Sequence, residues 1–276
     1  MTVLDETIQT LQQRNPSILH DVRIEDLVIG IFFTGVKLST GHAGVAFTPI
    51  GEIPEAVCCP TTAARMPQAG NLAGMAVWEV LHYAAEKNVL KSAIGVAAIN
   101  GVTQLFLESG VETEGKIVNG VDGFDLLKIQ PHETVSLIGA FGPYIRRLKM
   151  MGNPFFIIGR NPLTLREDER QFYRLESEMA PALEESNVIV MTGTAIVNHS
   201  IDTILSHLNK GIRSAIIGPT ASMLPDAFFK RGVDVMAGVR ILNSDSMISI
   251  LKQGGSAYHL LKECSEKMAF VKNESF

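Results

Sequence analysis

The stretch Val188-Ile189-Val190-Met191-Thr192-Gly193-Thr194 joins four apolar residues to a polar, glycine-containing turn. A short, wholly apolar run bounded by turn residues is typical of a β-strand that is buried on both faces. The pattern recurs in the second half of the chain, at residues 135–138, 155–158, 215–217 and 233–236. Helical patterns separate these runs, at residues 144–149, 167–185, 200–209, 225–231 and 246–252. The alternation predicts an α/β domain with a five-stranded, doubly wound, Rossmann-like parallel sheet and right-handed crossovers.

The first half of the chain has a different pattern, in which a hairpin precedes the main helices. We expect a helix, a long extended stretch and a second strand, at residues 4–13, 27–38 and 43–47. Two further helices follow, at residues 72–86 and 90–105, and the second carries small residues at Ala97, Ala98 and Gly101. A hairpin followed by helices predicts an α+β domain. Since residues 109–125 look like a linker, the sequence predicts two domains, at residues 1–115 and 116–276.

The composition of the 276-residue chain excludes several classes of protein. A hydrophobic content of 46% is ample for a buried core and excludes a disordered chain. A net charge of -5 without a basic run argues against nucleic acid as a partner. The three cysteines, at positions 58, 59 and 264, are too few for a disulfide framework, which favours a reducing cytoplasm.

The mean hydropathy of +0.19 raises the question of a membrane segment. A spanning helix needs roughly 20 predominantly apolar residues, whereas the best candidate, residues 71–85, is interrupted by Glu79 and His82. The first residues also lack the basic start and apolar core of a signal peptide. We therefore expect a cytoplasmic protein with no membrane partner, and the sequence leaves a homo-oligomer open.

Small and polar residues follow each of the five predicted strands. In an open parallel sheet, ligands bind outside the carboxyl ends of the strands, at the point where the strand order reverses. We therefore predict a small-molecule site there, built from Gly139, Phe141, Arg160, Thr192, Gly193, Thr194, Asn198, Gly218, Thr220 and Ser222. The alternative is that strand-to-helix turns simply need glycine, proline, serine and threonine.

Two departures from the usual motifs narrow the choice of cofactor. Phe141 stands where a dinucleotide-binding turn has its second glycine, and a bulky ring there obstructs the close approach of a pyrophosphate. Gly159-Arg160 follows the second strand, where an acid would bind the ribose of NAD or S-adenosylmethionine. Both cofactors are therefore disfavoured. Arg160 instead offers a fork of donors to a carboxylate or phosphate, unless it is an ordinary surface arginine.

Acid/base and metal chemistry have weaker support in the sequence. His199 and His42 are the best candidates for a catalytic acid or base. The alternative for the segment of His199 is that its neighbour Asn198 caps a helix. The alternative for His42 is that it lies in a solvated hairpin turn. No Gly-x-Ser-x-Gly elbow surrounds Ser222. The seven histidines and three cysteines lack metal-ligand spacing, so the metal stays unknown. Asn100, if buried, needs a hydrogen-bonding partner.

An ordered set of segments resembles one known family. The segment Ser92-Ala93-Ile94-Gly95-Val96-Ala97-Ala98-Ile99-Asn100 resembles a helix of the DUF364 family of heavy-metal chelation domains, with its N-terminal DUF4213 partner. Further similarities follow in order at residues 137–141, 192–198, 218–220 and 237–239. The resemblance implies an enolase-N-terminal-like domain, a Rossmann-like domain related in part to methyltransferases, and an active site in the cleft between them. It also implies a role in pterin, flavin or siderophore-type metabolism or in heavy-metal handling.

Three hypotheses follow for the function. The first is a protein that binds a small anionic or metal-chelating organic molecule in the interdomain cleft. One version of this hypothesis adds that the protein transforms the bound molecule chemically. The second is a non-catalytic protein that binds a metal or a metallophore in the same cleft. The third, which the missing ribose acid disfavours, is a relative of the S-adenosylmethionine-dependent methyltransferases.

Overall fold

The computed structural model describes residues 1–52 and 68–273. Cys58 and Cys59 therefore lie outside the described residues. The first half forms a three-stranded antiparallel sheet in the order β1-β2-β3, accompanied by helices. Its elements are α1 (Val3–Arg14), α2 (Pro16–Asp21), β1 (Ile24–Ile29), β2 (Phe33–Leu38), β3 (Ala43–Phe47), η1 (Ile50–Glu52), α4 (Val77–Leu81), η3 (His82–Ala85) and α5 (Val89–Glu108).

The second half forms an eight-stranded sheet in the order β4-β11-β10-β9-β8-β5-β6-β7. The strands from β10 to β7 are parallel, whereas β11 runs antiparallel to both of its neighbours. The strands are β4 (Lys116–Asn119), β5 (Val135–Ile138), β6 (Phe155–Gly159), β7 (Tyr173–Leu175), β8 (Val188–Thr192), β9 (Arg213–Ile217), β10 (Val235–Ile241) and β11 (Ser265–Val271). The predicted mixed α/β fold with a parallel sheet is confirmed.

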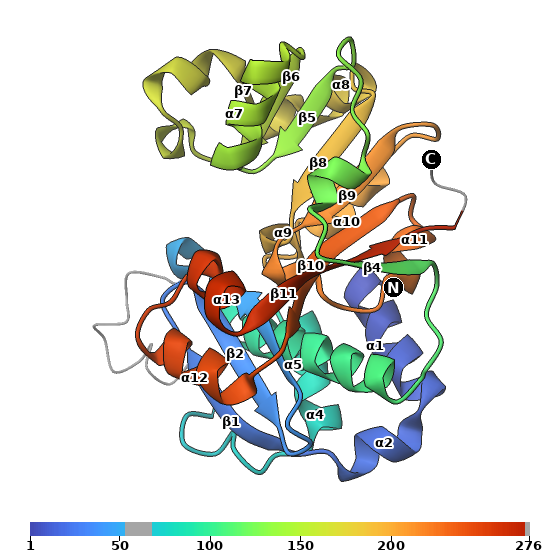
Figure 1. The fold of residues 1–276 in the computed structure, drawn as a ribbon, viewed down its shortest axis with the longest axis vertical. Helices are drawn as coiled ribbons and strands as arrows, with labels where there is room; N and C mark the ends of the chain where they lie inside the picture. Colours follow the sequence, from blue (N-terminus) through green and yellow to red (C-terminus); the bar gives the residue numbers. More distant parts are fainter. Residues whose placement is uncertain (53–67, 274–276) are drawn as a thin grey trace.

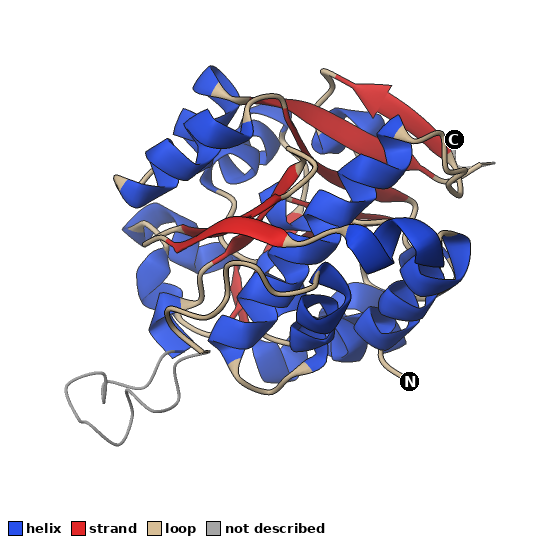
Figure 2. Cartoon of the chain, turned by 90° about the horizontal axis from the view of Figure 1, so that it is seen from below, coloured by secondary structure: helices blue, strands red, loops and turns tan. Residues whose placement is uncertain are grey.

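Helices pack on both faces of the large sheet, as Figure 2 shows. They are α6 (Gly123–Leu126), α7 (Gly142–Met151), α8 (Met179–Glu184), α9 (Thr194–Val197), α10 (Ile201–Ser206), α11 (Asp226–Phe229), α12 (Ser244–Lys252) and α13 (Ala257–Glu263). Short 3₁₀ turns complete the chain at η4 (Pro162–Thr164), η5 (Glu167–Phe172), η6 (Glu176–Glu178) and η7 (Pro219–Ala221). The central strands β5 and β8 are buried almost throughout, which explains their nearly continuous apolar sequence.

Helix α5 is the core helix of the first half. It is long and apolar enough to span a membrane by composition, but 89% of its most apolar window is buried inside the protein. The predicted small-residue stripe is what lets β3 pack so closely on it. A β-carbon on Gly44 of β3 would overlap the backbone of Ala97 and Gly101 in α5. The close contact therefore requires glycine at position 44.

Several expectations for individual elements are wrong. Residues 27–38 form two paired strands rather than one extended stretch, because the chain turns at Gly30, Ile31 and Phe32. Residues 167–185 contain two 3₁₀ turns, β7 and the short α8 instead of one helix. The stretch at 109–125 is not only a linker, since β4 lies within it and pairs with β11. The predicted helix at 72–86 is also shorter, beginning at Val77.

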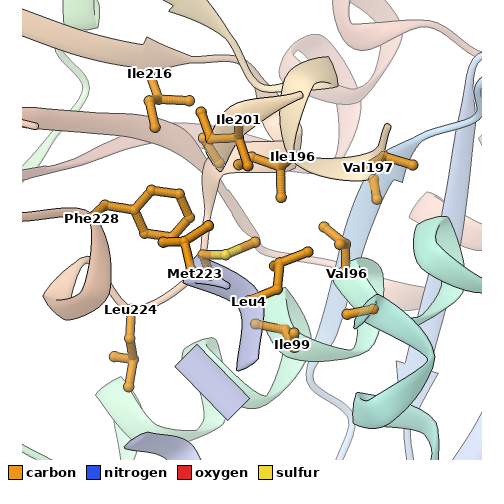
Figure 3. Close-up of a cluster of buried hydrophobic side chains, with 14 of the residues drawn as sticks. Leu4, Val96, Ile99, Ile196, Val197, Ile201, Ile216, Met223, Leu224 and Phe228 are labelled. Atoms are coloured by element: carbon orange, nitrogen blue, oxygen red, sulfur yellow. The ribbon is translucent and has the colours of Figure 1, made fainter. Parts of the chain in front are cut away.

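The two halves share one hydrophobic core. Figure 3 shows Leu4 of α1 and Ile99 of α5 among side chains of the second half, including Ile196, Ile216 and Phe228. On the other face of the small sheet, α12 packs against β1 and β2, beside which it lies in Figure 1. The small sheet is therefore enclosed between a helix of its own half and a helix of the other. The predicted domain boundaries, and the likeness of the first part to enolase, stay predictions.

Candidate functional site

The carboxyl ends of the parallel strands meet at one edge of the large sheet, where they face β2 and β3. Two cavities lie along this edge, with volumes of about 400 Å³ and 430 Å³. The first cavity lies over the ends of β8 and β9 and the middle of β10, and the second lies over the ends of β5, β6 and β8. Phe47, Thr192 and Thr194 line both. We call the two together the crevice.

The crevice lies where the strand order reverses. From β5 the chain moves outward to β6 and β7, and then returns to β8 on the other side of β5. Helices that leave adjacent strands in opposite directions open a space at such a point, which is where open parallel sheets bind ligands. The location agrees with the general rule on which the sequence prediction rests.

The first cavity has aromatic walls from both halves of the chain. Phe33 of β2 and Phe47 of β3 meet edge to face with ring centroids 6.5 Å apart. Phe141 and Tyr144, at the start of α7, lie with ring centroids 5.3 Å apart. Gly218 also lines this cavity. Its φ is +134°, a backbone conformation that favours glycine. The cavity is thus mainly apolar, as small-molecule sites usually are.

Two charged side chains, Asp122 and Lys267, line the first cavity. The carboxylate of Asp122 accepts hydrogen bonds from the Tyr144 hydroxyl at 2.8 Å, the Lys267 ammonium at 2.8 Å and the Phe124 backbone N–H at 3.0 Å. Burial acts to raise the pKa of Asp122, but the bonds from Lys267, Phe124 and Tyr144 outweigh it and hold the pKa below its ordinary value. Burial and the neighbouring Asp122 carboxylate raise the pKa of Tyr144, so this phenol stays protonated.

Sequence reasoning missed this cluster of Asp122, Tyr144 and Lys267. Asp122 closely follows β4, which runs parallel to β10 because both are antiparallel to β11. The carboxyl end of β4 therefore reaches the same edge as the ends of the other parallel strands. Lys267 enters from β11, beside Val239 of β10. If residues 116–119 had been identified as a strand of the large sheet, the sequence would have predicted Asp122 at this edge.

The second cavity has several polar residues in its lining, among them Arg160, Glu176 and Asn198. Arg160 lies 3.3 Å from a carboxylate oxygen of Glu52 and 3.3 Å from one of Glu176. Asn198 donates a hydrogen bond of 3.1 Å to Glu52 and accepts one of 2.8 Å from the Ser200 hydroxyl. Because Arg160 already pairs with two carboxylates, an incoming anion would compete with them for this guanidinium group.

The structure brings most of the predicted site residues to the crevice. The first cavity includes Phe141, Gly193, Gly218 and Thr220, the second includes Gly139, Arg160 and Asn198, and both include Thr192 and Thr194. These residues come from four separate strand-to-helix turns, so the tertiary fold is what assembles them. Their role in binding is still a prediction.

Neither predicted histidine lines either cavity. His42 Nε2 lies 2.9 Å from a carboxylate oxygen of Glu108, which also accepts a 2.9 Å hydrogen bond from Arg240. His199 Nε2 lies 2.9 Å from the carbonyl oxygen of Glu86. Both rings are therefore engaged in contacts outside the crevice, and the geometry gives no support to an acid/base role for them there.

Two further predicted residues are buried beneath the crevice. Asn100 of α5 donates to the carbonyl oxygens of Val45 at 2.8 Å and Thr220 at 3.0 Å, which ties β3 to the turn after β9. Ser222 accepts a 2.9 Å hydrogen bond from the Val239 N–H and lines neither cavity. The Thr220 hydroxyl also accepts a 3.0 Å hydrogen bond from the Phe47 backbone N–H. The bonds of Asn100 and Thr220 hold β3 to the turn after β9, whereas the bond of Ser222 holds that turn to β10.

The comparison with sequence families decides where the chain belongs. The DUF364 family, described as "Putative heavy-metal chelation", matches residues 122–270, which is more than half of the chain. The chain belongs to the DUF364 family. The DUF4213 family, with the same description, matches residues 13–103. The DUF364 match begins at Asp122, the first residue of the charged cluster.

Solved structures of DUF364 proteins share the fold. A DUF364 protein of unknown function from Pyrococcus horikoshii has a TM-score of 0.76 at 22% identity, covering 98% of this chain and 100% of that one. Another, from Desulfitobacterium hafniense, has a TM-score of 0.70 at 15% identity, covering 97% and 99%. An uncharacterised protein of Methanocaldococcus jannaschii is 26% identical over 194 residues, which are 68% of this chain and 69% of that protein.

The DUF364 description raises the question of whether the protein itself can hold a heavy metal. Such an ion needs several histidine, cysteine or carboxylate ligands that converge on one point. Within residues 1–52 and 68–273, no group of three or more such side chains is close enough to do so. The acids that lie at the crevice, Asp122, Glu52 and Glu176, are paired with Lys267 or Arg160 instead. The described residues do not fit a metal held by protein ligands alone.

Proposed function

We propose that this DUF364 protein binds a small anionic or metal-chelating organic molecule in the crevice at the carboxyl edge of its parallel sheet. The observation that carries the proposal is the pair of adjoining cavities at the point of strand reversal, together spanning Phe47 of the first half and Thr192 and Thr194 of the second. Each cavity has the volume of a small-molecule site. We further propose that the protein acts in the cytoplasm.

The donor set favours a chelating molecule over a bare ion. The family description concerns heavy-metal chelation, and the described residues offer no cluster of three metal-binding side chains. The family description and the lack of such a cluster are compatible if the organic molecule supplies the metal ligands. The protein would then bind that molecule through the aromatic and charged side chains of the crevice. Aromatic walls and a few convergent polar groups are suited to such a ligand.

The test is a binding screen of the purified protein by thermal shift and native mass spectrometry. The screen compares free Zn²⁺, Ni²⁺ and Cu²⁺ with pterins, flavins, catecholates and their metal complexes. We expect an organic chelator or its complex to raise the melting temperature more than any free metal ion at the same concentration. Stabilisation by a free ion alone, with none by an organic compound, would contradict the proposal.

A variant at the shared wall locates the binding. Thr194→Phe places a ring between the two cavities and is expected to weaken binding of the selected compound at least about tenfold, because the added atoms occupy ligand space. Thr203→Phe makes the same change at an exposed position of α10 and serves as the control. Equal binding by the two variants would place the ligand elsewhere on the protein.

A further inference from the structure

We propose that the first cavity binds a planar aromatic ring that carries an oxyanion, with the ring between the two aromatic pairs and the oxyanion on the ammonium group of Lys267. This inference rests on the proposed function and assigns the ligand's chemical class to one of the two cavities. It also gives Asp122 a distinct task, which is to hold the ammonium in place.

The arrangement of the aromatic side chains favours a flat ligand. Phe33 and Phe47 come from the small sheet, whereas Phe141 and Tyr144 come from the turn after β5 and from α7. The Tyr144 ring is fixed from behind by Phe124, with ring centroids 4.6 Å apart in a stacked arrangement. Aromatic rings prefer offset-stacked and edge-to-face neighbours, and both become available to a ring inserted between the pairs.

Lys267 is the only cationic side chain among the described residues that line the first cavity. An ammonium group has three N–H donors, and the structure shows one of them on Asp122. Two donors therefore stay available to a ligand. The Lys267 side chain is 41% exposed and lines the first cavity while it pairs with the partly buried Asp122. An oxyanion is the acceptor that such a charged donor binds most strongly.

Asp122 positions the ammonium without competing for the ligand's charge site. Its two oxygens already accept bonds from Tyr144, Phe124 and Lys267. A cationic ligand group that approached this carboxylate would meet the Lys267 ammonium 2.8 Å from it and be repelled by its like charge. The bound lysine thus makes the cavity selective for an anion, and the neutral ring walls select an aromatic body.

The test uses two small probes of the same shape. Quinoline-2-carboxylate carries a carboxylate on a planar bicyclic ring, and quinoline-2-carboxamide is its neutral counterpart. Isothermal titration in metal-free buffer is expected to give a dissociation constant at least about tenfold lower for the carboxylate, because only it forms a charge-assisted bond. In Lys267→Met the difference between the probes is expected to disappear, while weak binding of the ring persists.

Two further variants control for structural damage. Lys262→Met removes a lysine that lies outside both cavities and should bind both probes as the natural protein does. Lys210→Met changes a second exposed lysine that lines neither cavity, so the carboxylate should keep its advantage over the amide. Circular dichroism of each variant establishes that it is folded.

The outcomes separate this inference from the proposed function. Equal binding of the two probes to the natural protein, or an unchanged preference in Lys267→Met, overturns the inference. So does the absence of binding by both probes up to about 10 mM, a range that covers ligands of this size. If the screen nevertheless finds a chelator that Thr194→Phe weakens, the proposed function stands while the ring-and-oxyanion assignment fails.

Discussion

A single carboxylate, that of Asp122, connects three parts of the molecule. It caps α6 through the Phe124 N–H, fixes the Tyr144 hydroxyl of α7 and pairs with Lys267 of β11. Each of these donors would lose a partner if the carboxylate were removed. Half-buried donors without acceptors cost free energy, so Asp122 contributes to stability as well as to the charge of the first cavity.

Replacing Asp122 with asparagine tests that contribution through its dependence on pH. The amide oxygen of the asparagine could still cap α6, but the charge would be lost, and we expect the free energy of unfolding to fall by about 1 kcal/mol at pH 7. The folded-state pKa of Asp122 is below its ordinary value of 3.8. The charge therefore stabilises the fold above pH 3.8, and this stabilisation is lost as the pH falls through the lower folded-state value.

Urea unfolding of the natural protein and Asp122→Asn, measured from pH 7 down to about pH 3, checks this expectation. The gap between the two proteins should narrow at the acid end of the range. Asp21→Asn, at an exposed position, is the control and should stay within about 0.5 kcal/mol of the natural protein. A gap that stays constant with pH would show that the charge of Asp122 does not stabilise the folded state.

Among the elements, β3 and α5 form a close backbone contact in the first half. The small residues of α5 were expected to permit close packing, and the contact made by Gly44 of β3 confirms it. The same pair of elements carries Asn100, whose hydrogen bonds to Val45 and Thr220 link the small sheet to a turn at the crevice. A shift of β3 away from α5 would therefore disturb the crevice as well.

Gly44→Ala is expected to lower the free energy of unfolding by about 2–3 kcal/mol, because the added methyl group meets backbone atoms that cannot rotate away. Chemical denaturation gives the value. Gly51→Ala is the matched control, since a β-carbon at that position meets nothing within 4 Å. A cost for Gly44→Ala no larger than that of the control would mean that β3 and α5 separate easily.

At the scale of the whole molecule, buried side chains from both halves pack together in the core. Leu251 of α12 is 1% exposed and packs in a cluster with Phe33 and Val45 of the small sheet. On the other side of that sheet, α1 and α5 join the core of the second half. Two buried clusters therefore contain side chains from both halves, and a protein whose halves share their cores in this way is expected to unfold in one cooperative step.

Leu251→Ala tests this cooperation between the halves. We expect a loss of about 2–5 kcal/mol, seen equally in the fluorescence of Trp78 in the first half and in the hydrogen exchange of β8 and β9 in the second. Trp78 is the single tryptophan of the chain. Leu242→Ala, at a position that is 61% exposed, is the control. Separate transitions at the two probes would indicate halves that unfold independently.

The central strands and the turns that follow them could be predicted from the sequence alone. Strands such as β5 and β8 are buried on both faces, so nearly every residue in them is apolar and the run is visible without neighbours. The turns at Gly139, Thr192 and Gly218 carry small and polar residues for local reasons, and parallel strands necessarily bring their carboxyl ends to one edge. Many of the residues that line the crevice were predictable in this way.

The edges of the sheet and the charged end of the crevice, by contrast, become visible only in the folded chain. The strand β4 has mostly exposed residues and β7 has only three, so neither has an apolar pattern that local sequence reveals. Asp122 and Lys267 are 145 residues apart and meet because β4 pairs with β11. Long-range pairing of exposed strands leaves no local periodicity, which is the physical reason that the sequence did not reveal this cluster.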